Sequence, residues 1–219
     1  MPLKLVIANL KAELDTTETK TWLKGFTSLL KQTQLKNKQI IIAPPFIYLD
    51  MFKQQKEEYS LNIALGSQSL SEFAQGKYTG EITAAMLKDF VEYVIIGHSE
   101  ERRINQETKQ DIQKKIDLAN KYKVKVILCL ERKEKYTGEI FALAYEPTAA
   151  IGTGKAESAT KSYSQMQIFK QNIKAQHYLY GGSVNNDNVQ EFIQAGFTGV
   201  LVGKQSLEPK KLIEIVRNI

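Results

Sequence analysis

The chain has 219 residues, of which 42% are hydrophobic, and it carries a formal net charge of +6. This length and composition are enough for one fully packed core, and no low-complexity linker interrupts the chain, so we expect residues 1–219 to form a single domain. Its lysines are scattered rather than clustered, and no aromatic RNA-binding motif occurs, which argues against nucleic acid as a partner.

Membrane and disulfide-rich proteins are also disfavoured. No stretch approaches the roughly 18 consecutive apolar residues of a membrane span. The single cysteine, Cys129, lies inside an apolar run and cannot form a disulfide within one chain. Met1 leads directly into an apolar run without the pattern of a signal peptide, so we expect a soluble, cytoplasmic protein with no membrane partner.

Short apolar runs rich in β-branched residues alternate with amphipathic stretches along the whole chain. We expect strands near 4–9, 39–43, 62–66, 93–97, 124–130, 140–145, 177–181 and 199–202. We expect helices near 16–32, 48–57, 82–90, 105–122, 158–173, 186–195 and 208–219. Eight almost continuously apolar strands joined by helices predict an α/β fold, a (β/α)8 barrel whose active site lies at the carboxyl ends of the strands.

One connection breaks this alternation. Only residues 131–139 separate the expected strands 124–130 and 140–145, whereas parallel strands usually need a crossover of about a dozen residues or more, with a helix. Either this connection is a shortened, irregular loop without a helix, or one of the two runs is not a barrel strand. If the loop is shortened, no helix covers the outer wall of the barrel at these two strands. Tyr136, Phe141 and their neighbours, or another subunit, would then have to cover it.

Several expected strands end in side chains that suit acid–base chemistry. Asn9 and Lys11 lie two residues apart, so they point to the same side of the first strand. A lysine at the mouth of a barrel can attract an anionic substrate and polarise its carbonyl oxygen. Glu146 ends an apolar run just before Pro147, and a carboxylate in a water-poor pocket is a stronger base.

His98 follows the fourth expected strand. The next residues, 99–102, can form a helical turn whose amides point back at the imidazole, which favours a neutral ring that donates a hydrogen bond. Glu100, beside His98, is a second acidic candidate. His177 falls at the opposite end of its strand and is interpreted as structural.

Four segments carry a resemblance to a known family: 8–11 (ANLK), 97–100 (GHSE), 144–147 (AYEP) and 180–183 (YGGS). In this order they resemble the triosephosphate isomerase family across essentially the whole chain, and the AYEP segment favours the shortened connection over a missing strand. The resemblance implies reversible interconversion of dihydroxyacetone phosphate and D-glyceraldehyde 3-phosphate through an enediolate, in glycolysis and gluconeogenesis, without metal or organic cofactor. Glu146 would be the base, His98 the acid–electrophile, Lys11 the electrostatic stabiliser, Asn9 an orienting donor and Glu100 a polar partner of Lys11.

The phosphate-binding residues are implied by the same resemblance. Residues 150–155 (AIGTGK) resemble the family's lid, which closes over the phosphate through the backbone amide of Gly152. A GTGK string alone is weak evidence and lacks the spacing of a P-loop. Ser183 and Gly203 would complete the grip with backbone amides.

Residues 71–81 resemble the family's third loop, which enters a neighbouring subunit, so the resemblance implies a homodimer. Thr79 would brace Asn9 of the partner subunit. In the family the residue corresponding to Glu81 pairs with an arginine, which Glu101 replaces here. We expect Glu101 to turn toward Arg102, Arg103 or Lys77, or one of the two carboxylates to be protonated.

Other departures lie in the lid hinges, 147–149 and 155–157, and in the last phosphate loop, where Lys204 replaces a second glycine. Two other functions remain open. A different phosphate-binding barrel enzyme, such as an aldolase or a sugar-phosphate epimerase, would need a Schiff-base lysine inside the barrel or a cluster of metal ligands. A non-catalytic scaffold would not need the set Lys11, His98 and Glu146.

Overall fold

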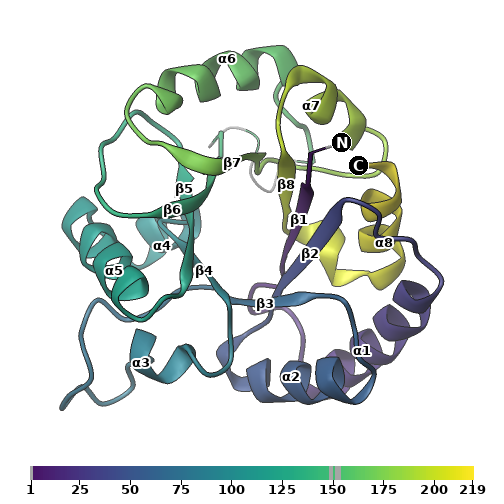
Figure 1. The fold of residues 1–219 in the computed structure, drawn as a ribbon, viewed down its shortest axis with the longest axis horizontal. Helices are drawn as coiled ribbons and strands as arrows, with labels where there is room; N and C mark the ends of the chain where they lie inside the picture. The colour runs from purple at the N-terminus through teal and green to yellow at the C-terminus, as the bar shows by residue number, and fades with distance from the viewer. Residues whose placement is uncertain (1, 148–149, 151–153) are drawn as a thin grey trace.

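The computed structural model describes residues 2–147, 150 and 154–219 and shows a closed barrel of parallel strands (Figure 1). The strands are β1 (Lys4–Asn9), β2 (Lys38–Ala43), β3 (Ala64–Ser67), β4 (Tyr93–Ile96), β5 (Lys125–Leu130), β6 (Ile140–Tyr145), β7 (Ala175–Tyr180) and β8 (Gly199–Val202). Each strand pairs with the next one in the sequence, and β8 closes the barrel on β1. The predicted (β/α)8 barrel is therefore confirmed.

The helices surround this barrel (Figure 1). They are α1 (Thr16–Lys31), α2 (Leu49–Glu58), α3 (Ala84–Leu87), α4 (Ser99–Ile104), α5 (Lys109–Lys121), α6 (Ala159–Lys170), α7 (Val189–Ala195) and α8 (Pro209–Asn218), with 3-10 turns η1 (Phe46–Tyr48) and η3 (Lys204–Leu207). One apolar cluster fills the barrel interior and a larger one lies between strands and helices. Most strand residues are thus buried on both faces, as the almost continuous apolar runs predicted, and the clearest exception is the first part of β7.

Two expected helices differ from the structure. The helix predicted over 105–122 begins only at Lys109, as α5, because Gln106 adopts a left-handed φ of 56° that does not fit a right-handed helix. A new helix then starts after Thr108, whose side chain forms a capping box with Asp111. The helix predicted over 82–90 is a single turn, Ala84–Leu87.

The connection between β5 and β6 contains no helix, as predicted. In its place, two side chains of α5 bind the loop backbone. Gln113 accepts from the Thr137 amide at 3.0 Å and donates to its carbonyl at 3.1 Å, and Asn120 makes the equivalent pair with Glu139 at 2.7 and 3.0 Å. The paired amide groups hold an irregular loop where a crossover helix would otherwise pack.

The same loop is tied to the end of β4. Tyr136 is 8% exposed and packs into the outer core. Its neighbour Glu134 lies 3.0 Å from a guanidinium nitrogen of Arg102, and Arg102 in turn donates to the Gly97 carbonyl at 2.7 Å. The prediction that Tyr136 covers this wall is confirmed.

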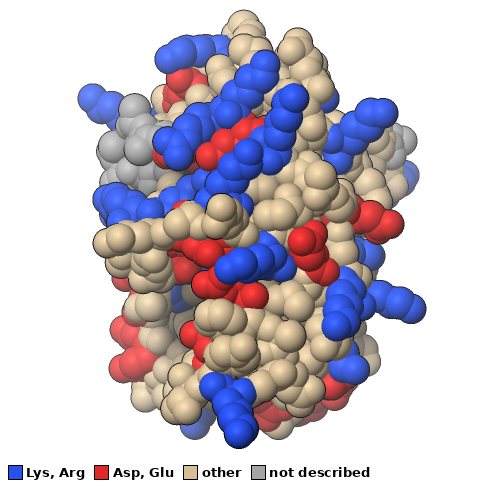
Figure 2. Space-filling view, turned by 90° about the vertical axis from the view of Figure 1, so that its left-hand side faces the viewer, with Lys and Arg blue, Asp and Glu red and all other residues tan. Residues whose placement is uncertain are grey.

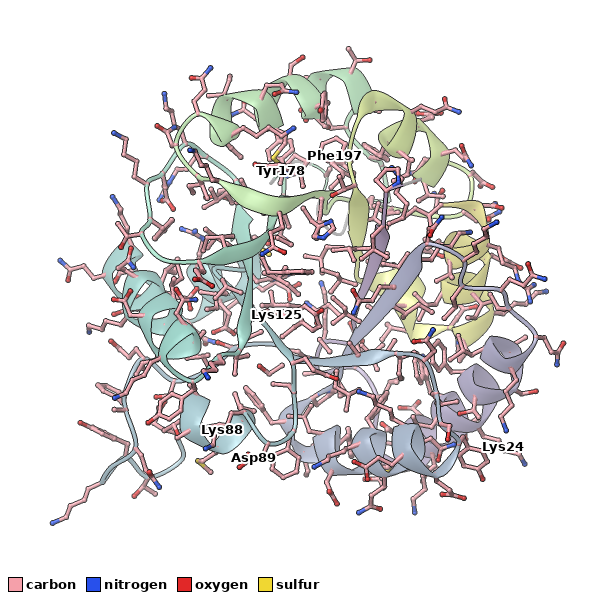
Figure 3. The ribbon with its side chains drawn as sticks, viewed as in Figure 1. Lys24, Lys88, Asp89, Lys125, Tyr178 and Phe197 are labelled. Atoms are coloured by element: carbon pink, nitrogen blue, oxygen red, sulfur yellow. The ribbon has the colours of Figure 1, made fainter. Side chains whose placement is uncertain are left out.

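Phe141 does not cover the outer wall, so that prediction is wrong. It packs against the interior cluster, with its ring 4.9 Å from both Tyr93 and His177. Lys125, at the start of β5, places its ammonium 5.2 and 5.5 Å from the rings of Tyr93 and Phe141 (Figure 3). These side chains fill the barrel at the ends where β4 to β7 begin, away from the carboxyl ends of the strands.

Gly138 provides a test of how the loop is held. Its φ is 101°, and an added Cβ would lie 2.5 Å from Oδ1 of Asn120. We expect Gly138→Ala to cost about 1–3 kcal/mol of the free energy of unfolding, through backbone strain and the clash. For a chain of this size, thermal denaturation should show a loss of about 2–4 °C per kcal/mol.

A double-mutant cycle identifies the clash. If Asn120 is the obstacle, Gly138→Ala and Asn120→Ala together should cost less than the sum of the two single changes. Strict additivity would show that the loop backbone moves away from α5 instead.

The outer surface carries both basic and acidic side chains. The side shown in Figure 2 carries lysines and arginines with aspartates and glutamates among them. Among the described helices, none is long and apolar enough to cross a membrane.

Candidate active site

A cavity of about 260 Å³ opens at the carboxyl ends of the strands. Its lining includes six of the predicted site residues: Asn9, Lys11, His98, Glu146, Ser183 and Gly203. They come from the ends of β1, β4, β6, β7 and β8 and are brought together by barrel closure. This is the end at which (β/α)8 barrels carry their active sites.

Lys11 is held in an unusual backbone conformation, with a φ of 52°. Asn9 stabilises it because its side-chain oxygen accepts the Lys11 amide at 3.0 Å. Gln68 supports the other side of the residue, donating to the carbonyls of Lys11 at 3.0 Å and Ala43 at 2.9 Å. Backbone strain of this kind is typical of functional sites, where surrounding contacts fix a side chain's direction.

Glu146 is 3% exposed and lies directly after β6. One carboxylate oxygen accepts the Ser99 amide at 3.0 Å, and the other lies 3.1 Å from Nε2 of His98. Burial raises the pKa of the Glu146 carboxyl above its usual value, although His98, the Ser99 amide and Lys11 oppose the rise. Glu146 is therefore a buried carboxylate with the raised basicity that a general base needs.

His98 is 7% exposed and caps helix α4. Its Nδ1 accepts the Glu100 amide at 3.2 Å, so Nδ1 carries no proton in this arrangement. The ring is then neutral, its proton is on Nε2, and Nε2 donates toward Glu146. The helical turn predicted after His98, with an amide pointing back at the ring, is confirmed.

Lys11 and Glu100 form an ion pair of 2.5 Å beside the cavity. Partial burial alone would raise the pKa of Glu100, but the hydrogen bond and charge of Lys11 outweigh it and the pKa is lowered. Glu100 therefore stays ionised next to the lysine and positions its ammonium group. The contact expected between Glu100 and Lys11 is thus present, and the supporting role of Glu100 in catalysis stays a prediction.

The remaining side of the cavity is formed by loops after β7 and β8. Ser183 has a φ of 51°, and its hydroxyl donates to the Ala150 carbonyl at 2.5 Å. A Cβ on Gly203 would lie 3.2 Å from Cε of Lys11, so glycine there leaves room for the lysine. Gly154 also lines the cavity, whereas Gly152, predicted to contact the phosphate, lies outside the described residues.

The sequence did not reveal several contacts that shape this site. Ser206 is fully buried and donates to the carbonyls of Asn9 at 3.1 Å and Gly203 at 2.6 Å. Glu157, at the second lid hinge, accepts from Tyr145 at 3.2 Å, while its amide donates to the Tyr180 hydroxyl at 3.0 Å. The candidate catalytic residues could be found because each follows an expected strand. The contacts of Ser206 and Glu157 join distant parts of the chain, and no local sequence pattern indicates them.

Thr79 does not line the cavity of its own chain, because it lies on an exposed segment.

Glu101 accepts a hydrogen bond from the Asn105 side chain at 3.0 Å. Arg102 points away from Glu101, toward Gly97 and Glu134. Of the alternatives expected for Glu101, a contact with Arg102 is absent among the described residues, while Arg103, Lys77 and a protonated carboxylate in the dimer stay predictions. Among the described residues there is also no group of three or more histidine, cysteine or acidic side chains arranged to hold a metal.

The fold and cavity define a (β/α)8 barrel with a buried carboxylate, an imidazole and a lysine around one small pocket at the carboxyl ends of its strands. The sequence profile of the triosephosphate isomerase family matches residues 4–219. The chain therefore belongs to the triosephosphate isomerase family, and it is an isomerase.

Individual relatives agree with this assignment. A triosephosphate isomerase of Dictyoglomus turgidum is 35% identical over 98% of this chain and 99% of the relative, and one of Mesomycoplasma hyopneumoniae strain 232 is 33% identical with the same coverage. The triosephosphate isomerase of Buchnera aphidicola from Acyrthosiphon pisum is 35% identical over 88% of each chain. The first two alignments span 250 and 242 positions, more than the 219 residues of this chain, so both relatives carry segments that it lacks.

Proposed function

We propose that this cavity performs the family's reaction with the residues assigned above. The reaction is the reversible interconversion of dihydroxyacetone phosphate and D-glyceraldehyde 3-phosphate, a step of glycolysis and, in the reverse direction, of gluconeogenesis. The observation that carries the assignment is the pairing of Glu146 with the protonated Nε2 of His98 at 3.1 Å. A carboxylate base and a neutral donor side by side suit the transfer of a proton between adjacent carbons.

Each step follows from these groups. Glu146 removes a proton from the carbon next to the carbonyl, and the electron pair moves to the carbonyl oxygen to give an enediolate. His98 Nε2–H and the Lys11 ammonium stabilise that oxygen, and Asn9 orients it. His98 Nε2 gives its proton to that oxygen and takes the proton of the hydroxyl on the adjacent carbon, which becomes the new carbonyl oxygen. Protonated Glu146 then returns its proton to the former carbonyl carbon, so every proton is accounted for and no external co-reactant is consumed.

Backbone amides near Ser183 and Gly203, with Gly152 of the lid, would bind the phosphate. Closure of the lid would exclude water and protect the enediolate from losing phosphate. The Ser183 hydroxyl, already bonded to Ala150 of the lid segment, supports a coupling between phosphate loop and lid.

A coupled isomerase assay on the purified protein tests this function. We expect turnover of glyceraldehyde 3-phosphate without added metal or organic cofactor, and unchanged turnover after treatment with a chelator. Aldol cleavage of a sugar diphosphate, or epimerisation of a pentose phosphate, in place of isomerisation would identify one of the other barrel enzymes. Phosphate binding without any turnover would support a non-catalytic scaffold.

We also propose that two copies form a homodimer and that the enzyme works in the cytoplasm. The segment 71–81 protrudes between β3 and α3 (Figure 1). It carries Phe73 and Tyr78, which are 37% and 46% exposed and stack at 4.4 Å. Burial of this aromatic pair against a second subunit would bring Thr79 to the partner's Asn9.

The proposed location in the cytoplasm is supported by the single cysteine. Cys129 is a buried free thiol, which suits a reducing compartment.

Glu101 offers a test of the dimer. It stands where the family has an arginine that pairs across the interface with the residue corresponding to Glu81, and two carboxylates brought together there would repel each other. We expect Glu101→Arg to lower the dissociation constant of the dimer by about tenfold, which corresponds to about 1.4 kcal/mol. Sedimentation at dilute concentration measures this constant.

The control is Glu101→Gln, which removes the charge without adding one and should tighten the dimer less. A weaker dimer in Glu101→Arg would show that the interface is built around the carboxylate.

A further inference from the structure

Lys204 is a charged residue at the cavity that the proposed mechanism does not use. It follows Gly203 at the start of η3 and lines the same cavity as Lys11, Ser183 and Gly203. Its side chain is exposed, and among the described residues it takes part in no ion pair or hydrogen bond. Lys204 therefore belongs to the cavity lining and carries an ammonium group that has no partner among the described residues.

The backbone that carries Lys204 is firmly held. Ser206, two residues later, is fully buried and donates to the carbonyls of Asn9 and Gly203 at 3.1 and 2.6 Å. The indole of Trp22 donates to the Ser206 carbonyl at 2.9 Å. These bonds attach η3 to β1 and α1, so packed elements hold the backbone of Lys204 in place relative to β1.

The charges around the cavity favour a role for this ammonium. The charge of Lys11 is offset by Glu100 at 2.5 Å, and ionised Glu146 adds a negative charge inside. Among the described residues, Lys204 is the one lysine of the cavity lining that has no ion-pair partner. It is therefore available to a phosphate dianion that enters the cavity. A compact ammonium with several N–H donors suits such an anion.

We propose that Lys204 is a phosphate-binding residue, which adds a charged contact to the backbone amides that hold the substrate phosphate. The proposal rests on the proposed function because it concerns the same site. It makes Lys204 a determinant of specificity for the dianionic substrate over an uncharged one. The chemistry stays with Glu146, His98 and Lys11.

The test compares Lys204→Gln with Lys204→Arg and with Lys210→Gln as a matched control. Lys210 is an exposed lysine of α8 that does not line the cavity, so its loss reports the change in overall charge alone. Titration with inorganic phosphate, followed by calorimetry, gives binding, and steady-state kinetics give KM and kcat for glyceraldehyde 3-phosphate.

We expect Lys204→Gln to raise the phosphate dissociation constant and KM by about three- to tenfold, as for a partly exposed ion pair, and to leave kcat within about twofold. Lys204→Arg should restore binding, and Lys210→Gln should change it less than about twofold. Turnover of glyceraldehyde, which lacks the phosphate, should be the same in the wild type and Lys204→Gln.

Equal phosphate affinity in Lys204→Gln and Lys210→Gln would overturn the proposal. So would an equal loss of turnover with glyceraldehyde and its phosphate ester, because Lys204 would then support the fold or the chemistry. Failure of the proposed function is separate: a wild type without isomerase activity would refute the mechanism, while the phosphate titration would still decide the role of Lys204.

Discussion

We expect Glu146→Gln to lower kcat by at least about 10²–10⁴-fold, the range typical of a lost general base. Glutamine has nearly the same shape as glutamate but cannot accept the proton from carbon. Measurement of kcat and KM in the coupled assay should show a loss in kcat with little change in phosphate affinity. A variant with wild-type kcat would remove Glu146 from the role of base.

The fold should survive this change because two effects oppose each other. Glutamine can accept only one of the two hydrogen bonds that the carboxylate accepts from Ser99 and His98, at a cost of about 1 kcal/mol. It also removes a buried charge whose ionisation burial disfavours. The thermal midpoint should therefore shift by only a few degrees, at about 2–4 °C per kcal/mol. The exposed Glu139, just before β6, provides the control Glu139→Gln, which should retain full activity.

The pH dependence of kcat/KM gives a second measure of the same residue. Because the ionised carboxylate is the base, activity rises as pH increases through the pKa of Glu146. Burial raises this pKa, so the acidic limb should lie above the value of about 4.3 of an ordinary glutamate. The substrate phosphate also titrates near about pH 6, and the profile should therefore be repeated with glyceraldehyde. A limb at or below the ordinary glutamate value would contradict the raised pKa.

The barrel could be predicted because its strands are largely buried and therefore appear in the sequence as separate apolar runs. The location of the site could then be predicted as well, because a closed barrel brings the residues that follow each strand to one end. Asn9, Lys11, His98 and Glu146 meet there although they are distant in the chain. The absence of a helix after β5 was also visible, because too few residues were left for one.

Features set by long-range packing could not be predicted. The break between α4 and α5 depends on a left-handed Gln106, which nothing in its residue type requires. Phe141 was expected on the outer wall, but the start of β6 directs it toward Tyr93 and His177. Gln68 acts across the barrel on Lys11 and Ala43, through contacts between distant segments.

Lys11→Met should have the other large effect. Methionine has a similar length without the charge, so the enediolate oxygen loses a cation in the transition state and the substrate loses one on binding. We expect kcat/KM to fall by about 10²–10³-fold or more, with a higher KM as well as a lower kcat. Steady-state kinetics with glyceraldehyde 3-phosphate measure the loss in kcat and the rise in KM. Calorimetry with a phosphate-bearing enediolate analogue measures the loss of binding.

Loss of the ammonium also leaves Glu100 without its partner at 2.5 Å, which would raise the pKa of that carboxyl and place an unpaired charge beside the cavity. The double variant Lys11→Met with Glu100→Gln separates the two causes. If repulsion from Glu100 were responsible, the second change would restore binding. If the lysine acts on the substrate directly, the double variant stays as inactive as the single one. The exposed Lys20 of α1 gives the matched control Lys20→Met, which should remain fully active. Undiminished affinity of Lys11→Met for the enediolate analogue would show that the ammonium does not face the substrate.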